Sequence, residues 1–130
     1  MDKKTLIAGL VAGLVYFLIT LLFSIVGMPY MQESFFRLHG ILWYVLKLPF
    51  DLLIGILFAI VYGYIRNSIP GKYWNRGFTY GFFVFFLAEI PMLAFLSLTF
   101  TLPGILLLIW TVGSFIARLL MGFVLALFIK

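Results

Sequence analysis

Cysteine is absent from this sequence of 130 residues, and histidine occurs once, as His39. Without cysteine, the chain can form no disulfide bond, no thiolate metal site and no thiol redox centre. A single histidine also excludes a haem held by two histidines of this chain. Charge is scarce, because only 10% of the residues are Asp, Glu, Lys or Arg, whereas about a quarter are charged in a typical soluble domain.

Apolar residues dominate the composition. Hydrophobic residues make up 65% of the chain and aromatic residues 20%, and the mean hydropathy is +1.23. A chain of this size cannot bury so much apolar surface in a water-soluble core. The composition therefore excludes a soluble enzyme, a nucleic-acid-binding domain and a disordered tail. It indicates an integral protein of the lipid bilayer, with no nucleic-acid partner and no cofactor.

Long apolar runs separated by short polar connectors predict membrane-spanning helices. We expect the spans at about residues 5–28, 41–65, 78–100 and 105–128, each long enough to cross a hydrocarbon core of ~30 Å. The first run is too long for a signal peptide, so we expect it to stay uncleaved. Because short connectors make neighbouring helices antiparallel, the predicted fold is all-α. It is an up-down-up-down four-helix bundle that forms a single domain over residues 1–130.

Positive charge is distributed unequally between the two sides of this predicted bundle. One side holds Lys3, Lys4, Arg66, Lys72, Arg76 and Lys130. The other side holds only Arg37, in the connector that also contains His39. Cytoplasmic segments of membrane proteins carry an excess of Lys and Arg. The asymmetry predicts a multi-pass protein of the cell (inner or cytoplasmic) membrane with both termini in the cytoplasm.

Similar spans indicate an internal repeat. The matches are Trp43 with Trp110, Asp51-Leu-Leu-Ile-Gly55 with Arg118-Leu-Leu-Met-Gly122, Ala59 with Ala126, and Gly9-x-x-x-Gly13 with Gly77-x-x-x-Gly81. We interpret them as duplication of a helical hairpin, which gives two parallel repeats with a pseudo-twofold axis along the membrane normal. The alternative is chance similarity between leucine-rich helices.

Small residues recur at four-residue spacing on these helices, which lets helix backbones approach closely in lipid. The predicted packing residues are Gly9, Gly13, Gly55, Ala59, Gly77, Gly81, Gly122 and Ala126. On spans 2 and 4 the small residues share a face with charged residues. We therefore expect these two faces to point into the bundle and at each other. The alternative is a contact between two copies of the chain.

Ionisable residues also lie inside the predicted spans, namely Lys47, Asp51, Glu89 and Arg118. At ~1.5 Å per residue, the last three lie roughly 15–20 Å from a span end, near the bilayer centre. An unpaired charge there costs roughly 2.5–3.5 kcal/mol on insertion scales, so we expect pairing. The repeat predicts that Asp51 faces Arg118 and that Glu89 shares the guanidinium. Lys47 either reaches outward or pairs with Asp51 one turn away.

These charges allow two interpretations. They form either a buried ion-pair network that fixes the helix arrangement or an ion or substrate site, because intramembrane charges often mark pathways. Pro49 and Pro91 lie close to the charges and are expected to kink spans 2 and 3. Broken helices can form midplane binding sites, but prolines are also common as simple kinks in membrane helices.

The segment from Tyr64 to Gly81 contains Ile69-Pro70-Gly71-Lys72 and then Arg76-Gly77. It resembles a pattern in small uncharacterised four-span membrane proteins of prokaryotes, in which a Pro-Gly connector leads into an Arg-Gly start of the third span. The resemblance covers the second half of span 2 through early span 3. It implies a fold and a membrane setting, and no functional residue.

No connector shows a recognisable catalytic motif in which an acid, a base and a nucleophile converge, and none contains a cluster of metal ligands. We therefore predict no catalytic residue and no metal site. The expected function is that of a non-enzymatic subunit, assembly factor or scaffold, whose partners are other membrane subunits or further copies of the chain. The alternative is a small oligomeric transporter or channel that uses the midplane charges.

Overall fold

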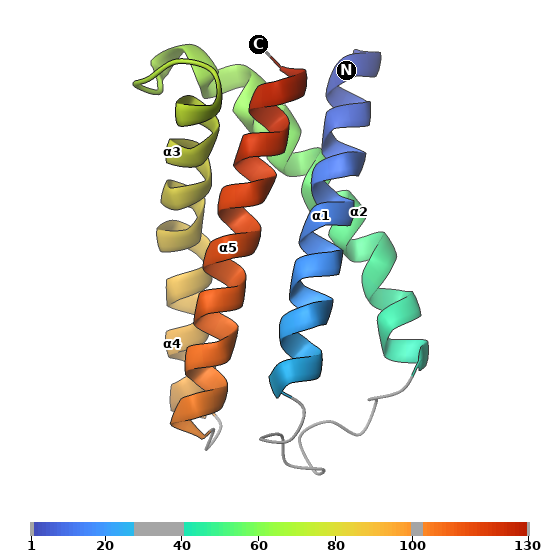
Figure 1. The fold of residues 1–130 in the computed structure, drawn as a ribbon, viewed down its shortest axis with the longest axis vertical. Helices are drawn as coiled ribbons and strands as arrows, with labels where there is room; N and C mark the ends of the chain where they lie inside the picture. Colours follow the sequence, from blue (N-terminus) through green and yellow to red (C-terminus); the bar gives the residue numbers. More distant parts are fainter. Residues whose placement is uncertain (1, 28–40, 100–102, 130) are drawn as a thin grey trace.

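The computed structural model describes residues 2–27, 41–99 and 103–129, which form helices and no strands (Figure 1). The helices are α1 (Lys3–Gly27), α2 (Ile41–Ile65), the short η3 (Arg66–Ser68), α3 (Trp74–Val84), the π-helical turn η4 (Phe85–Glu89), α4 (Ile90–Thr99) and α5 (Gly104–Phe128). Because α3, η4 and α4 follow one another without a break, they form one span. The predicted connector with Arg37 and His39 lies outside the described residues.

Helices that are long and apolar enough to cross a membrane are Lys3–Gly27, Tyr44–Ser68, Trp74–Thr99 and Gly104–Phe128. The predicted all-α, four-span architecture is confirmed, and the chain is a multi-pass membrane protein. The third span begins at Trp74 rather than near Phe78, because α3 already includes the polar residues Asn75 and Arg76. A hydropathy pattern alone places the start of the span after these residues because they are polar.

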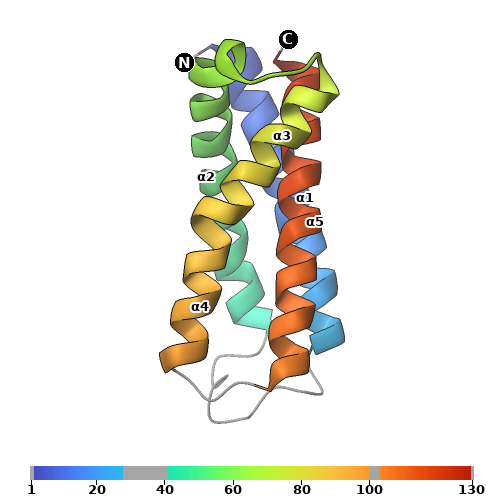
Figure 2. The same cartoon turned by 90° about the vertical axis from the view of Figure 1, so that its left-hand side faces the viewer.

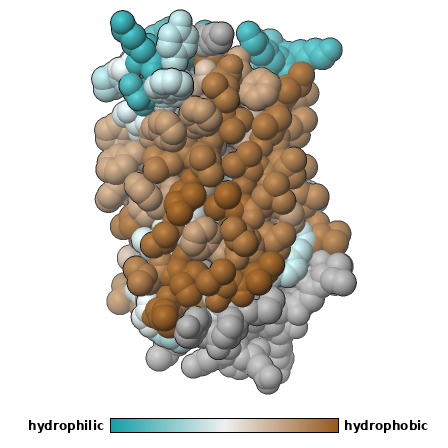
Figure 3. Space-filling model, in the orientation of Figure 1, coloured by the Kyte–Doolittle hydropathy of each residue, from teal (hydrophilic) through white to brown (hydrophobic). Residues whose placement is uncertain are grey.

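The two termini lie at the same end of the bundle (Figure 1). We call this the basic end, because its described cations are Lys3, Lys4, Arg66, Lys72 and Arg76. The surface is hydrophilic at this end and apolar around the middle (Figure 3). The outward-facing apolar side chains include Leu87 and Leu98, which are 78% and 88% exposed in the isolated chain. In a bilayer these side chains contact lipid or another protein.

The central helices of the bundle are α1 and α5. α1 packs against α2 and α5, and α5 packs against α1 and α3. α3 lies close against α5 near the basic end, whereas α4 runs away from α5 (Figure 2). We call the half of the bundle farther from the basic end the outer half. There α4 and α2 lie far apart (Figures 1 and 2).

Glycines bring the two helices of the first hairpin into backbone contact. A Cβ atom added to Gly55 of α2 would lie 2.2 Å from the carbonyl oxygen of Gly9 and 2.4 Å from the backbone nitrogen of Gly13. A Cβ added to Gly13 would lie 2.6 Å from the carbonyl oxygen of Asp51. Any side chain at these glycines would therefore push α1 and α2 apart.

The second hairpin repeats this contact with the matching glycines. A Cβ added to Gly122 of α5 would lie 2.0 Å from the carbonyl oxygen of Gly77, and one added to Gly81 would lie 2.3 Å from the carbonyl oxygen of Arg118. Residues that match in the sequence thus make matching contacts in the two hairpins. Gly81 lies against Arg118 as Gly13 lies against Asp51.

The prediction that the small faces of spans 2 and 4 point at each other is wrong. Gly55 faces α1 and Gly122 faces α3, so each glycine packs within its own hairpin. α2 and α5 come close at only a few positions, because α1 packs against both of them. The same glycines also cannot mediate a contact between two copies, since their close contacts lie inside the chain.

Aromatic side chains join the two hairpins near the basic end. The Tyr80 hydroxyl of α3 donates a hydrogen bond of 2.9 Å to the carbonyl oxygen of Phe58 in α2. The Tyr80 ring centroid lies 4.4 Å from that of Phe58 and 5.1 Å from that of Tyr62. Ala59 and Ala126 complete the buried cluster around these rings. The best-packed part of the interior is therefore the half nearer the termini.

Candidate functional site: a buried charge network

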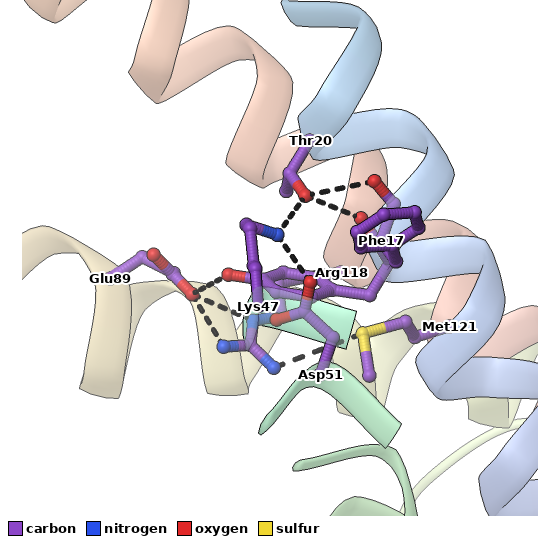
Figure 4. A network of polar contacts seen from close by, with 8 residues as sticks. Phe17, Thr20, Lys47, Asp51, Glu89, Arg118 and Met121 are labelled. Atoms are coloured by element: carbon purple, nitrogen blue, oxygen red, sulfur yellow. Dashed lines mark hydrogen bonds and ion pairs between the residues drawn. The ribbon is translucent and has the colours of Figure 1, made fainter. Parts of the chain in front are cut away.

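A network of polar side chains lies in the interior at the middle of the spans (Figure 4). Its charged members are Lys47 and Asp51 from α2, Glu89 from η4 and Arg118 from α5. Asp51, Glu89 and Arg118 are 3%, 2% and 7% exposed. Since these elements come from both hairpins, the network exists only in the folded bundle.

One ion pair of the network joins Arg118 to Glu89. The Arg118 Nε and Nη2 atoms both donate to the Glu89 Oε1 atom, at 2.9 and 2.5 Å. The remaining guanidinium nitrogen, Nη1, lies 3.8 Å from the sulfur of Met121. Because both strong hydrogen bonds end on one oxygen, the pair does not have the two-oxygen fork geometry that arginine and carboxylate often adopt.

A second ion pair lies within α2. The Lys47 ammonium group donates to Asp51 Oδ2 one helical turn away and, at 2.7 Å, to the hydroxyl oxygen of Thr20 in α1. The Thr20 hydroxyl in turn lies 2.8 Å from the carbonyl oxygen of Tyr16. Lys47 is thus held inside the bundle by two partners and does not reach outward to water.

The side chain of Tyr16 lies between the two ion pairs. Arg118 Cζ lies 4.6 Å from the centroid of the Tyr16 ring, and Lys47 Nζ lies 5.3 Å from it. Both cations therefore interact with one aromatic ring. The Tyr16 hydroxyl also approaches Glu89 Oε1 at 3.5 Å. Through this ring α1 connects the charges of α2 to those of η4 and α5.

The π-helical turn that presents Glu89 has a local cause in the sequence. Proline has no amide hydrogen, and its ring clashes with the carbonyl four residues earlier, so Pro91 disfavours a regular helix at Leu87. The chain widens into η4, in which the amide of Ile90 donates to the carbonyl of Phe85, five residues back. Such π turns occur frequently at functional sites.

The four predicted charges are thus brought together, and one of the expected pairs is missing. Glu89 does pair with Arg118, and Lys47 pairs with Asp51 one turn away. The predicted face-to-face pair of Asp51 and Arg118 is not formed, since Arg118 donates to Glu89 and Met121. The physical reason is again the helix order, because α2 and α5 each pack against α1 and hardly against each other.

Sequence reasoning missed Tyr16 and Thr20, which α1 contributes to the network. A signal was present, since both residues lie in the middle of an apolar span. Tyrosine usually lies at the membrane interface, where its hydroxyl reaches water, and a hydroxyl in hydrocarbon needs a partner. A polar residue at mid-span therefore indicates a polar neighbour on another helix.

One oxygen of the network has no partner among the described residues. Glu89 Oε2 is buried and unpaired, and it points away from Arg118 (Figure 4). A buried carboxylate oxygen without a hydrogen bond is costly. This atom can accept a hydrogen bond from a buried water or a small ligand.

We expect the Tyr16 ring to matter more than its hydroxyl. Tyr16→Phe should lower the free energy of unfolding by about 1 kcal/mol or less, because it removes only a long hydrogen bond. Tyr16→Leu also removes the contacts of both cations with the ring and should cost about 2 kcal/mol more. Unfolding of the purified chain in detergent, followed by helix content, measures both. Equal losses for the two variants would contradict this role of the ring.

The two predicted prolines both lie inside membrane spans. Pro49 lies within α2, which stays helical through it, and Pro91 follows η4. Among the described residues, no group of three or more His, Asp or Glu side chains could hold a metal ion. Comparison of the chain with family models, curated proteins and solved structures finds no match.

Proposed function

We propose that this chain is a non-enzymatic subunit of a membrane complex and acts as a scaffold for another transmembrane segment. The observation that carries the proposal is the exposure of α4, which packs against little of the chain. Only Leu93 of its ten residues is buried, and α4 diverges from α5 and from α2 in the outer half (Figures 1 and 2). We call α4 and the facing outer half of α2 the open edge.

Comparison of the two hairpins supports this proposal. In a fully symmetric bundle, the contact of α1 with α5 would have a counterpart between α2 and the third span. Here that counterpart is limited to the region around Tyr80, near the basic end. The open edge therefore lacks the helix contacts that the other interfaces have. A helix of another subunit, or of a second copy, would complete it.

The buried network supports a structural role rather than a catalytic one. Its two acids and two bases form two ion pairs inside the protein. Breaking a buried ion pair is costly, and the pair of Glu89 with Arg118 joins η4 to α5. A rigid interior of this kind suits a component that presents a fixed surface to its neighbours.

Photo-crosslinking in native membranes tests the proposal. A photoreactive residue replaces Phe95 on α4, and the matched control replaces Leu108 on α5, which is almost equally exposed (65% and 62%). We expect Phe95 to crosslink to a polypeptide of one defined mass and Leu108 to crosslink to lipid. A product of twice the mass of this chain would identify a second copy as the partner. Lipid adducts alone at both positions would refute the proposal.

A small oligomeric transporter or channel is the second candidate, favoured by the unpaired Glu89 Oε2 beside a π turn. Native mass spectrometry of the complex in mild detergent separates the two functions. A homo-oligomer that retains a small molecule, and loses it in Glu89→Gln, would favour transport. A complex with other polypeptides that is unchanged in Glu89→Gln would favour the scaffold.

The proposed orientation places both termini in the cytoplasm, on the basis of the cations at the basic end. Because the chain has no cysteine, single cysteines at Asn75 and Ser34 report the two sides. Ser34 lies in the connector outside the described residues. We expect a membrane-impermeant thiol reagent to label Ser34→Cys in intact cells and to label Asn75→Cys only after lysis. The reverse pattern would invert the orientation.

A further inference from the structure

A cleft of about 420 Å³ lies at the basic end, where the connector leads into α3. It is lined by Tyr62, Lys72, Tyr73, Arg76 and Ile129. Its volume lies within the range of small-ligand sites, ~300–1,000 Å³. The cleft is remote from the charge network, which lies at mid-span, so it belongs to a different part of the molecule.

The charged side chains that line this cleft are both cations. Lys72 is exposed, whereas Arg76 is half-buried and donates from Nη2 to the carbonyl oxygen of Gly71 at 3.2 Å. The Nε atom of Arg76 is buried and has no partner among the described residues. A guanidinium with an unused buried donor has an unmet need for an acceptor. Charges that serve only to orient a membrane protein do not require a buried donor of this kind.

The neighbouring cleft at the same end differs in its charge. It has a volume of about 690 Å³, is lined by Lys4 and Arg66, and also contains Asp2. The Asp2 carboxylate accepts a hydrogen bond of 2.8 Å from the amide of Thr5, and hydrogen bonding to Thr5 lowers the pKa of the Asp2 carboxyl. Asp2 is therefore anionic at neutral pH and offsets one cation there, while the cleft of Lys72 and Arg76 keeps its full positive charge.

We propose that the cleft lined by Lys72 and Arg76 binds a phosphate group. Arginine recognises phosphate through several parallel donors, and lysine adds a mobile point charge. Basic pockets at the ends of transmembrane helices can hold the phosphates of anionic lipid headgroups. The same chemistry suits a free phosphate in the aqueous phase. Both sources supply the same ligand, which is a phosphate group with no cationic group beside it in the same molecule.

Binding to the purified full-length chain in neutral detergent tests this site. Phosphatidylglycerol and phosphatidylcholine are added separately, and bound lipid is counted by native mass spectrometry. In a second experiment, the melting temperature of the chain is measured at increasing concentrations of inorganic phosphate. We expect the wild type to retain phosphatidylglycerol in preference to phosphatidylcholine. Arg76→Gln and Lys72→Gln should each weaken this binding about tenfold, the loss of one charge-assisted hydrogen bond.

Lys3→Gln is the matched control, because it removes a cation from the same end without lining the cleft, and it should change binding by about twofold at most. Inorganic phosphate that stabilises the chain and competes with the lipid would identify a free phosphate as the ligand. Phosphate without effect would identify the lipid headgroup. If Arg76→Gln misfolds, Lys72→Gln still tests the proposal, because Lys72 is exposed. Equal binding by Lys72→Gln and Lys3→Gln, or no preference in the wild type, would overturn the proposal.

Discussion

Replacing Arg118 by leucine should lower the free energy of unfolding by about 3–5 kcal/mol, because it leaves Glu89 buried without its partner. Glu89→Leu should cost a similar amount, since it isolates the guanidinium instead. The double variant Glu89→Leu with Arg118→Leu should recover much of the loss, because two apolar side chains then replace the whole pair. Reversible unfolding in mixed micelles, followed by helix content, gives the coupling energy.

The control for this experiment combines Arg118→Leu with Asp51→Asn. Asp51 is paired with Lys47 rather than with Arg118, so the coupling energy of these two variants should be smaller than that of Glu89 with Arg118, although both ion pairs contact the Tyr16 ring. If the double variant recovered stability, Asp51 and Arg118 would form the face-to-face pair that the repeat alone predicts. Strict additivity of the Glu89 and Arg118 variants would show that these residues do not act as a pair.

The second large effect concerns the glycine contacts within the hairpins. Gly122→Ala would place a methyl group 2.0 Å from the carbonyl oxygen of Gly77, so α3 and α5 must separate. We expect a loss of about 1–3 kcal/mol or more, the usual cost of overpacking. Gly55→Ala should cost as much, because its methyl group would meet Gly9 in the same way.

Gly63→Ala is the matched control, since a Cβ at Gly63 has nothing within 4 Å. The same substitution there should be neutral, or stabilising by at most about 1 kcal/mol through helix propensity. Melting temperatures of the three variants in one detergent compare them directly. A loss for Gly63→Ala as large as that for Gly122→Ala would mean that the glycines act through the helix backbone alone and not through close helix packing.

The spans could be predicted from the sequence because hydropathy and length directly reflect the thickness of a bilayer. The glycine pattern predicted correctly that backbones approach closely at Gly55 and Gly122, but not which helices meet there. Four-residue spacing defines a face of one helix and carries no information about its partner. Connector length does not decide the partner either, since the connector between α2 and α3 is shorter than that between α1 and α2, yet α2 and α3 hardly contact each other.

The charge network could be predicted as a set, with Glu89 on the Arg118 guanidinium and Lys47 on Asp51 as one of two alternatives, but the predicted pair of Asp51 with Arg118 is not formed. The depth of Asp51, Glu89 and Arg118 followed from the helical rise. Their pairing depends on the order of helices around α1, which the repeat alignment does not encode. The π turn depends on how the chain resolves the clash at Pro91. Only the general expectation of a distortion could come from the sequence.

The pairing has a consequence for how the chain enters the membrane during synthesis. Lys47 and Asp51 belong to the first hairpin, and Glu89 and Arg118 to the second, so each hairpin contains its own acid and base. Lys47 can meet Asp51 as soon as α2 has coiled, and Arg118 can meet Glu89 once the second hairpin has closed. The charges inside the spans of each hairpin can therefore be paired before that hairpin leaves the translocation machinery, and neither hairpin has to wait in the lipid with an unpaired midspan charge until the other arrives.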